Sequence, residues 1–414
     1  MTTRRGRVRA AVLLGILLGL ETTGVWPAQQ PAAQDPNRQA ALSLQQQGKV
    51  AEAEEAWRAY LKTHPDNPEP YAQLGLLEAR QEHYKEAVPL YRKALQMKPN
   101  VPGLRLNLGL ALFKSGDLEG ALPEFLICLK TATAGSADAQ RLNILIGMSH
   151  YGIAQYAEAV PFLKQAAAND QQNLPLRLAL AHSCLWSKQN ACVMEVYKEI
   201  LALNPDSAEA DMIAGEALDE EKDNEGSTRM FRAAVKANPK EPNAHFGLGY
   251  LLWTQKIYPE AATEFLAELG NDPNHVQAME YLGDTYIQLN EPEKARPYLE
   301  KTVQFDSSQS LAHLDLGIIY SDEGKDELAL RELLLAEQLK PDDVNVHWRL
   351  GRLYRTMGKK EEAKVEFDKA NKLNKAADEE LYKKMSSAHP RPPRDATQVA
   401  SPDATAPPPG TPPQ

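Results

Sequence analysis

The chain has 414 residues, of which 43% are hydrophobic and 25% charged, and its formal net charge is -10 at pH 7. These values are ordinary for a globular protein and leave room for a large core or an extended array. The acidic balance argues against nucleic acid and anionic membrane surfaces as partners, because both attract basic proteins.

The N-terminal segment has the composition of an export signal. Four arginines precede the apolar stretch AAVLLGILLGL at residues 10–20, which is too short to span a bilayer comfortably as a mature helix. We therefore expect residues 1–28 to be a signal peptide cleaved after Ala28, followed by a linker at residues 29–36. This predicts a periplasmic or secreted protein; the alternative is an inner-membrane protein anchored by an uncleaved N-terminal segment.

A 34-residue period runs through the rest of the chain. Two residue types keep the same register, and such a period indicates a repeat architecture. The 34-residue intervals separate Pro205, Pro239 and Pro273, and also Gly215, Gly249, Gly283, Gly317 and Gly351.

Each unit repeats one pattern, as residues 345–370, NVHWRLGRLYRTMGKKEEAKVEFDKA, illustrate. Leu350-Gly351 is followed by Tyr354, Ala363 and Phe367. This pattern resembles the tetratricopeptide repeat family. The resemblance implies an all-α fold, an α-solenoid right-handed superhelix of about ten helix-turn-helix repeats, over residues 37–375.

Some units depart from the pattern. The first has Ala41 at the glycine position, the fifth has Ala181 there, and the interval from Gly109 to Gly147 is 38 residues. We expect the four extra residues to lengthen a loop. Residues 376–388 then predict a polar-faced capping helix, and the Pro-rich residues 389–414 a disordered tail.

The repeated glycines lie in the middle of predicted helices, where glycine costs about 1 kcal/mol relative to alanine. We expect this cost to be offset by close approach of the second helix, with a small residue such as Ala261 facing Gly249.

The three cysteines are Cys128, Cys184 and Cys192. Buried apolar thiols are the favoured interpretation; a Cys184–Cys192 disulfide in an oxidising compartment is the alternative.

The sequence contains no recognisable catalytic motif, so we expect no enzymatic activity and no cofactor. His245, His313 and His347 recur once per repeat at one register. Equivalent positions in stacked helices are poorly placed to meet at one metal ion, so these histidines are predicted to be helix-packing residues, and no metal site is expected.

The family resemblance implies that the first helix of each repeat lines a concave surface. The lining positions fall three residues before the glycine and one, four and five after it. The predicted partner-binding residues are Leu110, Phe113, Met148, Tyr151, His182, Trp186, Glu216, Asp219, Phe246, Tyr250, Trp253, Trp348, Arg352 and Arg355. The competing interpretation is that some of these side chains only pack against the next repeat, and that Glu216 and Asp219 belong to a solvated charged face.

These patterns predict a non-catalytic, exported scaffold that binds a peptide or protein segment in its concave groove. Phe246, Tyr250 and Trp253 are the expected anchors because aromatic residues are enriched in binding hot spots, with Arg352 and Arg355 available for acidic partner residues. The expected partners are other proteins and not nucleic acid, with membrane contact only through an uncleaved N-terminal segment. The alternatives are a cell-envelope assembly or secretion accessory factor and, more weakly, a glycan-binding or enzyme-associated module.

Overall fold

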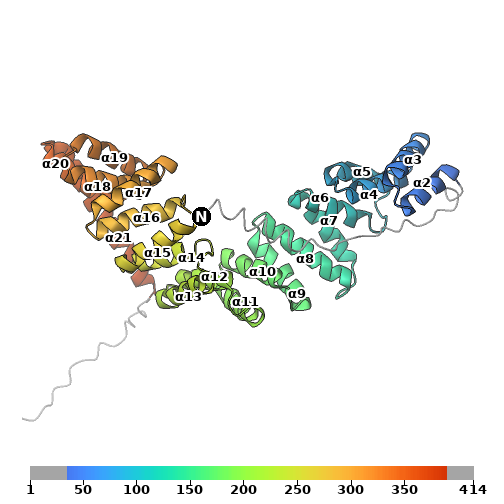
Figure 1. Ribbon diagram of the computed structural model, residues 1–414, viewed down its shortest axis with the longest axis horizontal. Helices are drawn as coiled ribbons and strands as arrows, with labels where there is room; N and C mark the ends of the chain where they lie inside the picture. The colour runs from blue at the N-terminus through green and yellow to red at the C-terminus, as the bar shows by residue number, and fades with distance from the viewer. Residues whose placement is uncertain (1–34, 389–414) are drawn as a thin grey trace, which may run out of the picture. The chain divides into compact units, whose positions relative to one another are not determined.

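The computed structural model describes residues 35–388, with side chains described as far as Glu380, and every regular element in that range is a helix. Its helices pair into ten hairpins (Figure 1), which confirms the predicted all-α solenoid. The chain forms two compact units, Met1–Ala278 and Met279–Gln414, hereafter unit 1 and unit 2.

The helices of the hairpins are short and of similar length, with one long exception at the end of the described chain. Unit 1 contains α2 (Pro36–Gln46), α3 (Val50–Thr63), α4 (Pro68–Arg80), α5 (Tyr84–Met97), α6 (Leu104–Lys114), α7 (Leu118–Thr131), α8 (Ala137–Gly152), α9 (Tyr156–Asn169), α10 (Leu174–Trp186), α11 (Asn190–Leu203), α12 (Ala208–Glu220), α13 (Asn224–Ala237), α14 (Ala244–Thr254) and α15 (Tyr258–Asn271). Unit 2 contains most of α16 (Val276–Gln288), then α17 (Pro292–Phe305), α18 (Ser310–Asp322), α19 (Asp326–Leu339), α20 (Val344–Thr356) and α21 (Lys360–Ala388).

Contacts between hairpins show which helices lie on the inner side of the array. In unit 1 the second helices from α3 to α13 each pack on their own first helix and on the next first helix, as α13 does on α12 and α14. The first helices also contact one another directly: α8 touches α10, and α10 touches α12. Direct contact between first helices of neighbouring hairpins places them on the shorter side of a curved stack, so these helices form the inner surface of unit 1.

The turn inside each hairpin ends the first helix with one residue in the left-handed region. Gly116 (φ 89°) adopts it without strain, whereas Lys222 (φ 66°) adopts it despite its side chain. In α4 the amide of His83 then donates back to the carbonyl of Glu78 at 3.0 Å. This backbone pattern satisfies the last carbonyls of the helix and reverses the chain within a few residues.

The mid-helix glycines make room for a large side chain, which differs from the expected small residue. A Cβ on Gly249 would lie 2.8 Å from Cε1 of Phe265 on the paired helix, and Phe265 is fully buried. Ala261 is also fully buried, but it is Phe265 that occupies the space left by the glycine. The same relation holds sixteen residues after each glycine, as at Gly351 and Phe367.

Two predicted boundaries are corrected by the structure. The four extra residues between Gly109 and Gly147 mostly extend a helix: α8 has 16 residues, whereas α10 has 13, and the loop at residues 132–136 is one residue longer than that at residues 170–173. Residues 376–388 form the end of the 29-residue helix α21 and are not a separate capping helix. In both places the sequence favours helix, so the added residues extend an existing helix instead of starting a new element.

Cys184 on α10 and Cys192 on α11 form a disulfide, which corrects the favoured interpretation of both as buried thiols. The pair lies eight residues apart across the turn of one hairpin. Cys128 is free, and burial raises the pKa of its thiol.

The proposed signal peptide, most of the linker and the Pro-rich tail lie outside the described residues 35–388. Within the described range, none of the helices is long and apolar enough to cross a membrane.

Candidate functional site: an aromatic stripe on α14

Three aromatic side chains on α14 form a continuous surface, which we call the α14 stripe: Phe246, Tyr250 and Trp253. All three are partly exposed, and they belong to a first helix on the inner side of unit 1. The ring centroids of Phe246 and Tyr250 are 6.4 Å apart, and those of Tyr250 and Trp253 are 6.0 Å apart. These separations lie within the range of favourable aromatic contact, so the rings order one another.

The start of α14 is held by a carboxylate from the paired helix. Glu268 on α15 accepts from the amide of Asn243 at 2.9 Å and from the amide of Phe246 at 3.1 Å. Asn243 itself has a left-handed backbone (φ 64°). A buried carboxylate that satisfies two free amides fixes a helix N-terminus. The Phe246 end of the α14 stripe is therefore anchored to α15.

The ring of Phe246 also contacts two other rings, those of Phe265 and His275. It lies 6.0 Å from the ring of Phe265 and 4.9 Å from that of His275, measured between centroids. His275 in turn has Nε2 at 2.8 Å from the Asn243 side-chain oxygen and accepts the amide of Ala278 at Nδ1. The sequence did not predict Glu268 or His275, because they follow Phe246 by 22 and 29 residues and do not lie on α14.

The other predicted lining residues of unit 1 are less accessible. Leu110, Phe113, Met148 and Tyr151 are buried, which fits the packing interpretation better than an open groove lining for these four. Leu110 and Phe113 belong to the apolar core formed by α4–α12.

A second aromatic group lies around Trp186 on α10. Its ring is 4.8 Å from that of His182, 4.6 Å from Tyr156 and 6.0 Å from Tyr151, and His182 Nε2 is 2.9 Å from a carboxylate oxygen of Glu209. Trp186 and His182 are partly buried. The sequence missed Tyr156 because it opens the second helix of its hairpin.

Glu216 and Asp219 on α12 are both partly buried.

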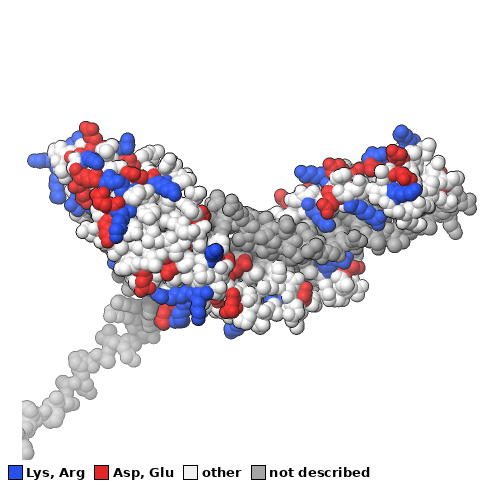
Figure 2. Space-filling model, in the orientation of Figure 1, with Lys and Arg blue, Asp and Glu red and all other residues white. Residues whose placement is uncertain are grey.

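The predicted residues of α20 belong to unit 2 and are exposed there: Trp348 keeps 46% of its surface accessible. The ring of Trp348 meets that of Phe367 edge-on at 5.0 Å, and the guanidinium of Arg355 lies 5.9 Å from the same ring. Arg352 is exposed. On the face seen in Figure 2, acidic and basic side chains are interspersed over α18–α20.

The repeated histidines make polar contacts that the sequence did not predict. Each places Nδ1 against a carboxylate nineteen residues later on the paired helix: His245 and Glu264 at 2.6 Å, His313 and Glu332 at 2.8 Å, His347 and Glu366 at 2.7 Å. In the last two, Nε2 also meets a backbone carbonyl six residues earlier. The histidines thus link the two helices of a hairpin by hydrogen bonds.

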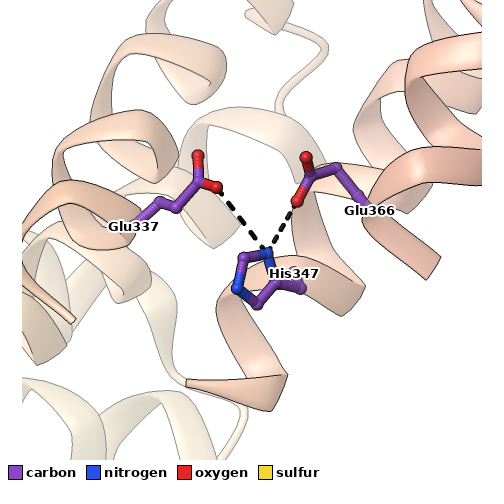
Figure 3. Close-up of side chains that lie close together, drawn as sticks. All are labelled: Glu337, His347 and Glu366. Carbon is purple, nitrogen blue, oxygen red and sulfur yellow. Dashed lines mark hydrogen bonds and ion pairs between the residues drawn. The ribbon is translucent and has the colours of Figure 1, made fainter. Parts of the chain in front are cut away.

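One of these pairs has a third group beside it. Glu337 on α19 approaches Nδ1 of His347 to 3.9 Å, and the ligand atoms of Glu337, His347 and Glu366 all lie within 4.8 Å of one another (Figure 3). However, the Lys369 ammonium lies 2.8 Å from both carboxylates, and hydrogen bonds to Glu337 and then Glu366 raise its pKa. Within residues 35–380, the pairs of His245 and His313 belong to no such three-membered group. Since Lys369 contacts both carboxylates beside His347, we interpret this cluster as an ion-pair network.

The chain is a stack of hairpins whose first helices form the inner surface of unit 1. One of these first helices, α14, carries a partly exposed aromatic stripe. Tetratricopeptide repeat models match residues 38–102, 72–137, 154–217, 223–276, 261–310 and 344–376. These matches cover well over half of the chain, so the chain belongs to the tetratricopeptide repeat family. It is therefore a protein-interaction scaffold of a generally non-catalytic family.

Among its relatives, Protein CTR9 homolog from Arabidopsis thaliana is 25% identical over 295 residues, which are 67% of this chain and 26% of that protein. TPR repeat-containing protein PA4299 from Pseudomonas aeruginosa is 33% identical over 139 residues, 34% of this chain and 51% of that protein. A tetratricopeptide repeat protein from Parabacteroides merdae has a crystal structure that covers 61% of this chain and 97% of its own, with 17% identity and a TM-score of 0.44. The chain spans about a quarter to a half of the length of these two curated relatives.

Proposed function

We propose that the protein binds an extended or helical segment of another protein along the inner surface of unit 1, with the α14 stripe as the anchor. The observation that carries this proposal is the packing of Phe246, Tyr250 and Trp253 into one partly exposed row. Large aromatic side chains in such rows offer much contact area with little loss of rotamer freedom, which is why they dominate binding hot spots.

The rigidity of the stripe also supports the proposal. Glu268 caps α14, and Phe265 and His275 support the Phe246 ring. A preorganised surface loses less conformational entropy on binding than a flexible one. Amphipathic helices and extended peptides are the segments that bind apolar surfaces on repeat and helical scaffolds.

The experiment is photo-crosslinking in the native cell from position 253, followed by mass spectrometry to identify the bound segment. A synthetic peptide of that segment is then titrated against the full chain and its variants. The double variant Tyr250→Ala/Trp253→Ala should weaken binding at least 30-fold, because loss of a hot spot costs about 2 kcal/mol or more.

The matched control is Leu266→Ala. Leu266 lies on α15, the second helix of the same hairpin, and is 42% exposed. The affinity of the Leu266→Ala variant for the peptide should stay within twofold of wild type. Equal affinity of the double variant and the wild type, with the fold intact by circular dichroism, would rule out the α14 stripe as the anchor.

We further propose that the chain is exported, on the basis of the basic and apolar character of residues 1–28 and supported by the Cys184–Cys192 pair, since disulfides persist in oxidising compartments. Protein recovered from the periplasm or medium should begin at Gln29, and alkylation without reduction should modify Cys128 alone. Reduction of the disulfide should destabilise unit 1 by about 2–3 kcal/mol, the value expected for so short a loop. A full-length, fully alkylated product would contradict export.

A further inference from the structure

We propose that unit 2 contains a binding site for an arginine side chain of the bound protein, formed by Glu280 and Asp284 on α16 and Asp315 on α18. The inference rests on the proposed function in so far as the arginine belongs to a bound protein segment. It adds a charge that the bound protein must carry.

Glu280 and Asp284 stand at lining positions of their repeat, three residues before and one after Gly283. They lie one turn apart on α16, so they share a face of that helix. Glu280 is 6% exposed and Asp284 4% exposed. Glu280 is held in place because it accepts the backbone amides of Leu311 and Ala312 at the start of α18.

Asp315 supplies the observation that points to a ligand. It is only 2% exposed, and its Oδ2 atom is fully buried with no hydrogen-bond partner. The charged groups that act on it are the carboxylates of Asp284 and Glu280 and the guanidinium of Arg349 on α20. A buried carboxylate oxygen without a donor is costly, and this one stands among like charges. A cationic donor placed between these carboxylates would remove the cost.

The chemistry favours an arginine over a metal ion. A divalent cation needs its ligand atoms gathered in one coordination sphere. In residues 35–380 the group of acidic, histidine or cysteine side chains gathered within 4.8 Å is the one at Glu337, His347 and Glu366, and it does not include these three carboxylates. A guanidinium has five donors in a plane and is weakly hydrated, so it can bridge carboxylates that stand further apart and enter a nearly closed site.

The test uses the full chain and an acetylated, amidated heptapeptide with one arginine at its centre and alanine elsewhere. Binding is measured by isothermal titration calorimetry. We expect saturable 1:1 binding, and no measurable binding of the same peptide with citrulline, which keeps the shape of arginine without its charge. Asp315→Asn and Asp284→Asn should each weaken binding at least tenfold.

The control variant is Asp322→Asn, because Asp322 is an exposed residue of the same helix α18 and the change in net charge is identical. Its affinity should stay within twofold of wild type. Absence of binding at 5 mM peptide, equal binding of the citrulline peptide, or equal weakening by Asp322→Asn would overturn the proposal. So would displacement of the peptide by an equimolar amount of CaCl₂ or ZnCl₂, since that identifies a metal site.

Two features keep the test independent of the fold and of the α14 stripe. Asp315→Asn keeps the shape of the buried side chain, so the variant should remain folded, which a thermal melt measures. Tyr250→Ala/Trp253→Ala should bind the arginine peptide normally. If only the aspartate variants lose affinity for the arginine peptide, the site in unit 2 is identified. If the α14 stripe proves not to be the anchor, binding of the arginine peptide in unit 2 is unaffected.

Discussion

Gly247→Ala is expected to lower the free energy of unfolding of unit 1 by about 2 kcal/mol, although alanine is the better helix former. A Cβ at this position would overlap the ring of Phe231 on α13, and Phe231 is almost fully buried. Overpacking of this kind costs about 1–3 kcal/mol, while the gain in helix propensity is at most about 1 kcal/mol. Because Gly249 meets Phe265 on the other side, α14 has little room to shift away.

Gly270→Ala is the matched control for this change. Gly270 lies near the end of α15, and no heavy atom lies within 4 Å of a Cβ built on it. Its replacement should raise stability by about 0.5 kcal/mol through helix propensity alone. The measurement is hydrogen exchange of α13–α15 peptides by mass spectrometry. Protection of these helices equal to wild type in Gly247→Ala would show that the glycine is not required for packing.

Unit 2 is expected to lose stability as the pH rises through about 7. Burial raises the pKa of Glu280 to about 7, and the charges of Asp306 and Asp284 add to the effect. Burial also raises the pKa of Asp315, with Asp284 and Glu280 adding to it. A raised pKa means that the folded state holds a proton that the unfolded state releases above pH 4.5. This stabilisation is full below about pH 4.5 and lost by about pH 8, which for Glu280 amounts to about 3 kcal/mol.

The variant that tests this is Glu280→Gln, which carries no titrating proton. Its stability should change less between pH 5 and pH 8 than that of wild type, and at pH 8 it should exceed wild type. Glu293→Gln, on the exposed surface of α17, should follow the wild-type profile. The readout is urea denaturation followed by hydrogen exchange of α16–α18 peptides. An unchanged pH profile in Glu280→Gln would contradict the assignment.

The sequence determined the fold because its signals are local and repeated. Gly249 and its counterparts, with the prolines in the same phase, placed ten hairpins correctly. The same pattern separated Leu248, Leu251 and Leu252, which are buried, from the partly exposed α14 stripe. Helical periodicity acts within one element, so it can be read without knowledge of distant neighbours.

Only the tertiary structure decided which groups meet across helices. The pairing of Cys184 with Cys192, the cap that Glu268 provides for α14 and the histidine–glutamate pairs each join residues of different helices. The buried carboxylate of Asp315 became visible only when α16, α18 and α20 were packed together. The physical reason is that burial and electrostatic interaction depend on distance in space, whereas the repeat pattern records only distance along the chain.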